Sequence, residues 1–297
     1  MPRRLYAVVA FVVLLAACGS TDNAATVNGS AVFAADLEQT VSDFAAVGET
    51  QIIDGVADGE TVRGLLTSLI RAEATKQVLA DAGEAVTDAD LEAVRTQFDS
   101  QNIEGFPQTL LDLIAELNAA NAALGRVQSP SADLVAARYE KNPKSLGMLC
   151  VRHLVVEKEA TARAALDELS DSPTDEQFAA VAGKYSFEPN AKETGGALQG
   201  QSGECIALNE YQAGFDPDFV RGALAARTGV PTQPVKSSFG WHVIYVRPFT
   251  AVADSVSQAL NAAAGEYLLL GALADADITV ASRYGKWNPL TGQVVAP

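Results

Sequence analysis

The spacing of apolar residues changes near Met148, and this change limits the chain to a fold built from two kinds of module. Between residues 34 and 142 the apolar residues recur at the intervals of amphipathic helices, in a stretch rich in alanine. From Met148 to Phe249, β-branched runs alternate with helical segments, and Trp241 to Arg247 alternates residue by residue as a strand does. A length of 297 residues allows two domains. We therefore expect an α+β protein with an alanine-rich helical domain and a mixed α/β domain.

The C-terminal region returns to the helical pattern. Asp254 to Leu273 is again alanine-rich and helical, and Asp277 to Val280 follows as a short strand. The expected boundaries, in chain order, are a signal peptide at 1–17, a tether at 18–25, a helical domain at 26–143, a mixed domain at 147–250 and a C-terminal helix and strand at 251–297.

The N-terminus carries the features of an export signal. Arg3 and Arg4 precede an apolar run over residues 5–17, which is too short for a membrane span of about 20 residues but suits a signal peptide. The run ends in small residues before Cys18, an arrangement that resembles the bacterial lipobox. That resemblance implies a lipid on Cys18 that anchors the chain outside the cytoplasm, at the bacterial cell membrane. An ordinary signal peptide or a short anchor is the alternative.

The charge balance excludes some partners. The chain has 37 acidic and 21 basic residues, for a formal net charge of -16. Such a chain repels phosphate backbones, so we expect no nucleic acid partner. It also avoids anionic membrane surfaces, so membrane attachment needs the lipid.

Two cysteines remain after Cys18. In an exported chain, Cys150 and Cys205 form a possible disulfide, although two buried free thiols or half of a metal site would also account for them. Cys150 and His153 are three residues apart on an expected strand and face opposite sides, which argues against a shared metal.

Histidine is rare in this chain and confined to one segment. The two histidines, His153 and His242, fall in the first and last strands that we expect in the mixed domain. If these strands pair, the imidazoles come together. Taken alone, such a pair is more often structural than functional.

The surroundings of the histidines resemble the parvulin peptidyl-prolyl isomerases over about 100 residues, in the family's order and spacing. The matching motifs are RHLVV at 152–156, FAAVA with a following Tyr-Ser at 178–186, GGAL at 195–198, the helix from Phe219 to Gly229, and PVKSSFGWHVI at 234–244. The resemblance implies a small antiparallel sheet with helices, prolyl isomerase activity, and neither cofactor nor metal.

The resemblance also assigns site residues. A proline pocket would be formed by Leu198, Phe215 and Phe219. A catalytic polar network would be formed by His153, His242, Glu188 and Ser237. Glu188 stands where exported parvulins usually have Asp, and its alternative role is that of a solvated turn residue. Ala197 and Gln199 depart from the family's Gly-Gly-Asp-Leu-Gly pattern, so that turn is expected to differ.

The flanking segments resemble exported foldases of the SurA and PrsA type. Thr26-Val27-Asn28-Gly29 followed by helices is similar to their N-terminal part, in which a helical chaperone domain holds the client. A segment after the isomerase domain returns to complete it, a part that residues 260–280 would play within the C-terminal segment 251–297. Considered without the resemblance, this helical region is a packing domain with no site of its own.

Three functions follow as hypotheses. The first is a lipid-anchored peptidyl-prolyl isomerase and folding chaperone, acting on unfolded or folding exported polypeptides that contain Xaa-Pro bonds. The second is a non-catalytic holdase chaperone with an inactive parvulin domain. The third is an interaction or scaffold lipoprotein.

Overall fold

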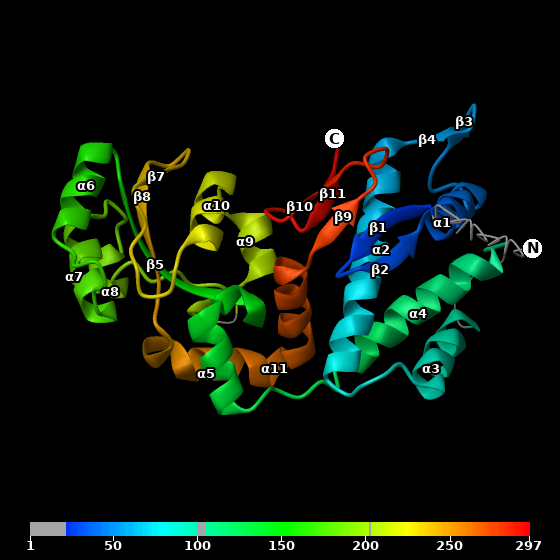
Figure 1. Ribbon diagram of the computed structural model, residues 1–297, viewed down its shortest axis with the longest axis horizontal. Coiled ribbons are helices and arrows are strands. Elements are labelled where there is room, and N and C mark those ends of the chain that lie inside the picture. The colour runs from blue at the N-terminus through cyan, green and yellow to red at the C-terminus, as the bar shows by residue number, and fades with distance from the viewer. Residues whose placement is uncertain (1–21, 100–104, 202) are drawn as a thin grey trace, which may run out of the picture.

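Two lobes lie side by side along the long axis of the molecule (Figure 1). The computed structural model describes residues 22–99, 105–201 and 203–297. Cys18 and the expected signal peptide lie outside the described residues. We call residues 22–127 together with 264–297 the N-terminal lobe, and residues 148–248 the α/β lobe. Within the described ranges, no helix is both long enough and apolar enough to span a membrane.

The N-terminal lobe begins with a hairpin and continues as helices. Its elements up to residue 124 are β1 (Asn23–Val27), β2 (Ser30–Phe33), α1 (Ala34–Ala46), β3 (Ile52–Ile53), β4 (Val56–Ala57), α2 (Gly59–Asp81), α3 (Asp88–Asp99) and α4 (Gln108–Leu124). Asn28 and Gly29 both have positive φ, 51° and 85°, as the two-residue turn between β1 and β2 requires. The Asp58 side chain accepts a hydrogen bond from Thr61 N and so begins α2.

The C-terminal segment returns to this lobe. Strand β9 (Ile278–Val280) pairs antiparallel with β1 and gives a three-stranded sheet of order β2-β1-β9. The hairpin of β10 (Lys286–Asn288) and β11 (Gln293–Val295) lies against α2, where Val294 N donates to Thr67 Oγ1 over 2.9 Å. Residues from both ends of the chain therefore share one core, which includes Val27, Leu37, Leu66, Ile70, Leu269 and Leu273.

The α/β lobe is built on an antiparallel sheet of order β6-β5-β8-β7. Its elements are β5 (Met148–Val156), α6 (Glu159–Asp167), α7 (Asp175–Tyr185), α8 (Ala191–Thr194), β6 (Cys205–Ala207), α9 (Leu208–Gly214), α10 (Pro217–Ala225), β7 (Val235–Lys236) and β8 (Trp241–Val246). One face packs Leu154 and Val243 against Phe178 of α7, and the opposite face packs Val151 and Ile244 against Phe219 of α10. The predicted α+β class, with a small antiparallel sheet and helices, is confirmed.

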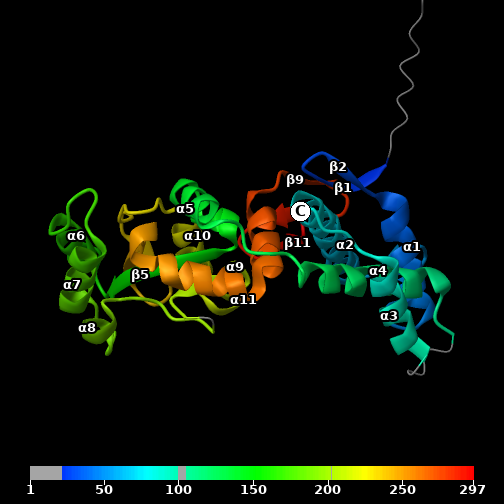
Figure 2. The same cartoon turned by 90° about the horizontal axis from the view of Figure 1, so that it is seen from below.

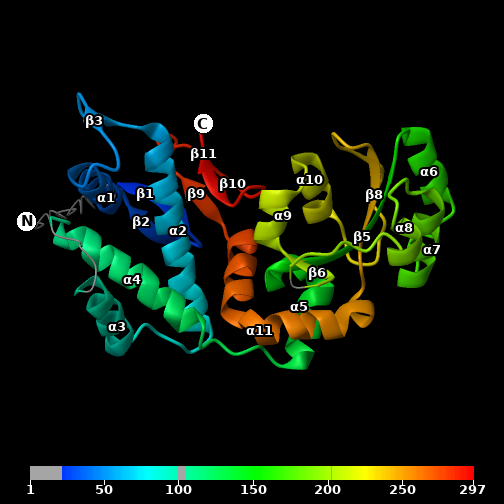
Figure 3. The ribbon, with the colours of Figure 1, turned by 180° about the vertical axis from the view of Figure 1, so that it is seen from behind.

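A long helix joins the two lobes over the region where the sequence predicts a helix at 254–273, and it is interrupted within that region. Helix α11 (Phe249–Asp275) contains a non-helical residue, Ala263, so that its two halves run in different directions (Figures 2 and 3). Gly265 follows this break, and a Cβ there would lie 2.1 Å from the carbonyl oxygen of Leu124. Only glycine allows α11 to approach the end of α4 this closely.

The two halves of α11 contact different partners. The first half packs with α5 (Ala132–Lys141) and the 3₁₀ turn η1 (Pro143–Leu146) against the base of β5, where Val256 and Leu260 share a core with Met148. The second half contributes Leu269 and Leu273 to the core of the N-terminal lobe. The C-terminal segment therefore divides its contacts between the lobes.

Candidate functional site

The two histidines meet on one face of the β5–β8 pair. The register places His153 opposite Ile244 and Val155 opposite His242, so the two imidazoles are near neighbours. Their Nδ1 atoms are 3.2 Å apart, and the rings stack with centroids 5.4 Å apart at 14°. The side chains of both histidines are buried.

A polar residue lies at each end of the histidine pair. The Glu188 carboxylate is 3.1 Å from His153 Nε2, and Ser237 Oγ is 2.7 Å from His242 Nε2. Ser237 Oγ also accepts a hydrogen bond from Phe239 N over 3.0 Å. The structure thus brings all four residues of the expected polar network into one chain of contacts: Glu188, His153, His242 and Ser237.

The contacts limit where the protons of this network lie. An ionised Glu188 only accepts, so His153 donates to it from Nε2. A neutral imidazole has one donor and one acceptor nitrogen, so His242 donates at one of its two contacts, to His153 or to Ser237, and accepts at the other.

The electrostatics of the site favour a neutral His242 and an ionised Glu188. Burial lowers the pKa of His242 from 6.5 to about 4, and the neighbouring His153 lowers it further. The hydrogen bond from His153 outweighs partial burial and holds the pKa of Glu188 below its ordinary value. At neutral pH the site therefore presents a carboxylate and a neutral His242.

Aromatic rings cover the histidine pair from the side of α10. Phe219 contacts both imidazoles edge-on, with centroids 5.4 Å from His153 and 5.1 Å from His242. Phe215 stacks beside Phe219 at 5.8 Å, and Leu198 packs in the same cluster. Phe215 and Leu198 are half-buried, so the three residues assigned to the proline pocket form a partly open apolar surface next to the network.

Two glycines beside the site, Gly195 and Gly196, are required by the backbone conformation and by close packing against β5. Gly195 and Gly196 have φ of 61° and 72°, and a Cβ on Gly196 would lie 2.0 Å from the carbonyl oxygen of His153. His153 N donates to Gly196 O over 2.8 Å, which ties this turn to β5 at the histidine itself. The turn also leads into Leu198, so the backbone at this point orients two site residues.

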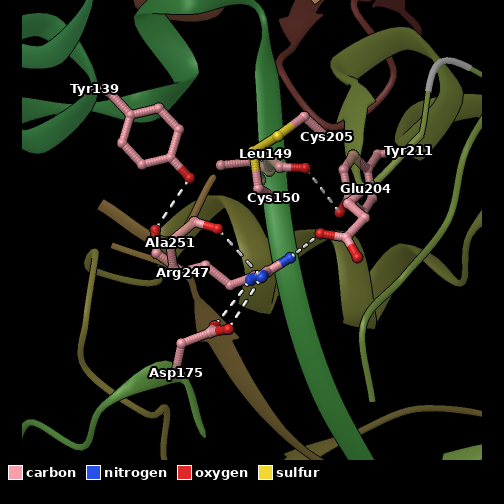
Figure 4. The surroundings of a disulfide bond; sticks show 9 residues. All are labelled: Tyr139, Leu149, Cys150, Asp175, Glu204, Cys205, Tyr211, Arg247 and Ala251. Atoms are coloured by element: carbon pink, nitrogen blue, oxygen red, sulfur yellow. Dashed lines mark hydrogen bonds and ion pairs between the residues drawn. A yellow bond between two sulfur atoms is a disulfide. The ribbon is translucent and has the colours of Figure 1, made fainter. Parts of the chain in front are cut away.

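A buried ion cluster on the opposite face was not found from the sequence. The Asp175 carboxylate accepts two hydrogen bonds from Arg152 and two from Arg247, all between 2.8 and 3.0 Å. Burial alone would raise the pKa of Asp175, but the hydrogen bonds and charges of the two arginines outweigh it and leave the pKa lowered. Arg247 also pairs with Glu204 (Figure 4). The cluster links β5, α7 and the end of β8.

Cys150 and Cys205 are joined by a disulfide next to this cluster (Figure 4). The two residues are directly opposite in the β5–β6 pair, with Cα atoms 4.1 Å apart, and both are buried. Because each sulfur is bonded to the other, the free-thiol and metal-site alternatives do not describe this structure. The bond holds β6 against β5 just before α9 leads to Phe215.

One family model matches the chain, the PPIC-type PPIASE domain (rotamase), over residues 151–248, about one third of its length. Similar proteins include the foldase protein PrsA of Clostridium kluyveri, 32% identical over 133 residues, and that of Latilactobacillus sakei, 34% identical over 127. Each alignment covers 42% of this chain, and it spans only 35% and 38% of those relatives. Foldase protein PrsA 3 of Bacillus anthracis is 25% identical over 285 residues, which are 91% of this chain and 89% of the relative.

Solved structures of similar proteins give weaker matches. PrsA from Bacillus subtilis aligns with 76% of this chain and 91% of its own, at 19% identity and a TM-score of 0.29. SurA-like chaperones of Campylobacter jejuni, described as PEB4 and Cj1289, align with 82% of this chain and 92% of the matched chain, at 20% identity and a TM-score of 0.29. These scores are too low to carry a structural argument.

Proposed function

We propose, from the premise that residues 151–248 form a parvulin-type domain, that this protein is a peptidyl-prolyl cis-trans isomerase and folding chaperone for exported polypeptides. The observation that supports this most is the contact of Phe219 with both imidazole rings. It sets an apolar surface for a pyrrolidine ring directly against a polar network. A substrate amide held there would have its proline side in an apolar environment and its carbonyl near polar groups.

Catalysis of this reaction requires tighter binding of the twisted amide than of the planar amide, and no covalent bond is formed or broken. Amide resonance sets a barrier of about 18–20 kcal/mol for rotation about an Xaa-Pro bond. In the twisted transition state this resonance is lost, so groups that favour the twisted amide over the planar one accelerate the exchange. Leu198, Phe215 and Phe219 would hold the proline ring and exclude water.

The polar network would act on the amide itself. The side chain of Glu188 is 34% exposed, so a bound peptide can reach it, and its lowered pKa keeps the carboxylate charged. A fixed negative charge near the carbonyl oxygen disfavours the planar form, in which that oxygen carries the most negative charge. His153, His242 and Ser237 would keep Glu188 and the floor of the pocket in position.

The site of action that we propose is outside the cytoplasm. Residues 1–17 have the pattern of a signal peptide and Cys18 that of a lipidation site, which together would tether the protein to the cell membrane. A Cys150–Cys205 disulfide agrees with an oxidising compartment. Several similar proteins carry the name foldase, in agreement with unfolded exported chains as clients.

A refolding assay limited by proline isomerisation tests the proposal. The unaltered protein should accelerate the slow phase, and the His153→Ala and Phe219→Ala variants should each lose most of that acceleration. Lys192→Ala, at an exposed position of the same lobe, is the control and should keep full activity. Absence of acceleration by the unaltered, folded protein would overturn the proposal.

A holdase without catalysis is the second candidate function. It is favoured by a cavity of about 850 Å³ in the N-terminal lobe, which the isomerase site does not use. Suppression of client aggregation by a protein that does not accelerate the proline-limited phase would select this function over the first.

A further inference from the structure

A cavity of about 850 Å³ lies in the N-terminal lobe, among α1, α2, α3, α4 and the strand β2. This volume falls within the range of about 300–1,000 Å³ that is typical of ligand pockets. Aliphatic side chains from three helices form much of the wall: Leu69, Leu79, Leu91, Leu113 and Leu117. The cavity is in a different lobe from the histidine pair, so it constitutes a separate site.

The charged residues of this cavity are almost all acidic. Six carboxylates line it, Asp36, Asp43, Glu73, Glu84, Asp112 and Glu116, against a single basic side chain, Lys76. Arginines from outside the cavity pair with two of them, Arg126 with Glu84 and Arg95 with Asp112. The remaining carboxylates leave the cavity with a negative potential over an apolar wall.

Asp43 is the most informative of these carboxylates. Its residue is only 5% exposed, and it lies on α1 facing the start of α4. Its two oxygens accept hydrogen bonds from neutral groups, Gln39 Nε2 at 2.8 Å and Thr109 Oγ1 at 2.6 Å. Across the described ranges, no lysine or arginine makes an ion pair with it. A buried carboxylate without a positive partner is stabilised when a cation approaches it.

We propose that the cavity binds an extended polypeptide segment in which a lysine or arginine is flanked by aliphatic side chains. The basic group would approach Asp43, and its methylene stem and its neighbours would pack on the leucines. The aliphatic wall favours such a segment over a hydrated metal ion. The inference rests on the proposed function in one respect, that the ligand is an unfolded polypeptide, and it names the chemistry of that client at a second site.

The test is fluorescence anisotropy with the full-length protein and a labelled, proline-free peptide. The peptide carries one central arginine between leucines and valines, and a matched peptide has glutamine in place of the arginine. We expect the glutamine peptide to bind about tenfold more weakly at low salt. We expect rising salt to reduce the difference, since screening weakens the ion pair.

Variants assign the effect to the cavity. Asp43→Asn keeps the shape of the side chain and should lower affinity for the arginine peptide about tenfold, with little further loss on changing the peptide. Asp81→Asn makes the same charge change on α2 outside the cavity lining and should leave affinity unchanged. Ala72→Trp fills the cavity without changing its charge and should weaken both peptides.

Equal binding of the arginine and glutamine peptides by the unaltered protein overturns the inference, and so does undiminished affinity in a folded Asp43→Asn variant. If circular dichroism shows that Asp43→Asn unfolds, the peptide comparison and Ala72→Trp decide the question. Binding of Ca²⁺ that displaces the peptide, with equal affinity for both peptides, would identify the cavity as a metal site and overturn the inference as well.

A parallel isomerase assay on the same preparations, with a short proline peptide, separates this inference from the proposed function. Loss of peptide selectivity with intact isomerase activity removes only the cavity proposal. Intact selectivity without isomerase activity removes only the catalytic one.

Discussion

Each lobe buries a carboxylate, and the two carboxylates are partnered in opposite ways. Asp175 in the α/β lobe is 7% exposed and Asp43 in the N-terminal lobe is 5% exposed. Asp175 is neutralised by Arg152 and Arg247, whereas Asp43 has only the neutral donors Gln39 and Thr109 among the described residues. The buried carboxylate of the α/β lobe is thus neutralised within the protein, whereas that of the N-terminal lobe makes no ion pair with any described residue.

Replacing each aspartate by asparagine should produce the largest contrast. Asp175→Asn leaves the largely buried Arg152 without its carboxylate partner and Arg247 with Glu204 alone, and we expect a loss of about 3–5 kcal/mol in the free energy of unfolding. Asp43→Asn removes a buried charge that lacks a partner, so we expect stability to stay within about 1 kcal/mol or to rise. Urea denaturation followed by circular dichroism measures both. Similar losses for the two variants would contradict the contrast.

Removing the disulfide should weaken the α/β lobe alone. Cys150 and Cys205 are 55 residues apart in sequence, and we expect the double variant Cys150→Ala/Cys205→Ala to lose about 2–4 kcal/mol of stability. Hydrogen exchange, measured amide by amide, should show faster opening of β5 and β6 and unchanged protection in α2. A matching loss of protection in α2 would show that the two lobes unfold as one unit.

The comparison also explains what sequence patterns could and could not predict. Asn28-Gly29 and the alternation along each strand are short-range patterns, so the turn and the strand faces were readable. The contact between His153 and His242 joins residues 89 apart, and the sequence pointed to it only through the family resemblance. The salt-bridge partners of Asp175 are 23 and 72 residues away, and no local pattern pairs them. Arg152 was visible only as part of a strand motif.

Two other features depend on long-range packing. The break at Ala263 lies in a segment whose apolar residues continue on both sides, so periodicity alone predicts an unbroken helix. The cavity is lined by residues from four separate helices, and only their arrangement places Asp43 inside it. In each case the determining contact joins elements that are far apart in the chain.

The buried imidazole pair should make the stability of the α/β lobe depend on pH. The pKa of His242 is lowered from 6.5 to about 4, so below pH 6.5 the unfolded chain binds a proton that the native state excludes. Above pH 6.5 His242 is neutral in both the folded and the unfolded state, so it contributes nothing to the pH dependence of stability. As the pH falls from 6.5 towards 4, the free energy of unfolding should decrease by up to about 1.4 kcal/mol per pH unit. Urea denaturation between pH 7 and pH 5 measures the slope. His242→Gln should reduce it, and an unchanged slope in that variant would contradict the assignment.

The smallest expected effect concerns the charge of Glu188 at the edge of the preorganised network. Glu188→Gln keeps an oxygen that can accept from His153 Nε2, now 3.1 Å from the carboxylate, but it removes the negative charge. We expect kcat/KM for a short proline peptide to fall about tenfold, which is about 1.4 kcal/mol, with KM little changed because the apolar pocket is intact. Glu188→Asp keeps the charge on a shorter side chain, so its kcat/KM should lie between those of the unaltered protein and Glu188→Gln. Full activity in Glu188→Gln would make this carboxylate a solvated turn residue and confine catalysis to the imidazole pair and its aromatic cover.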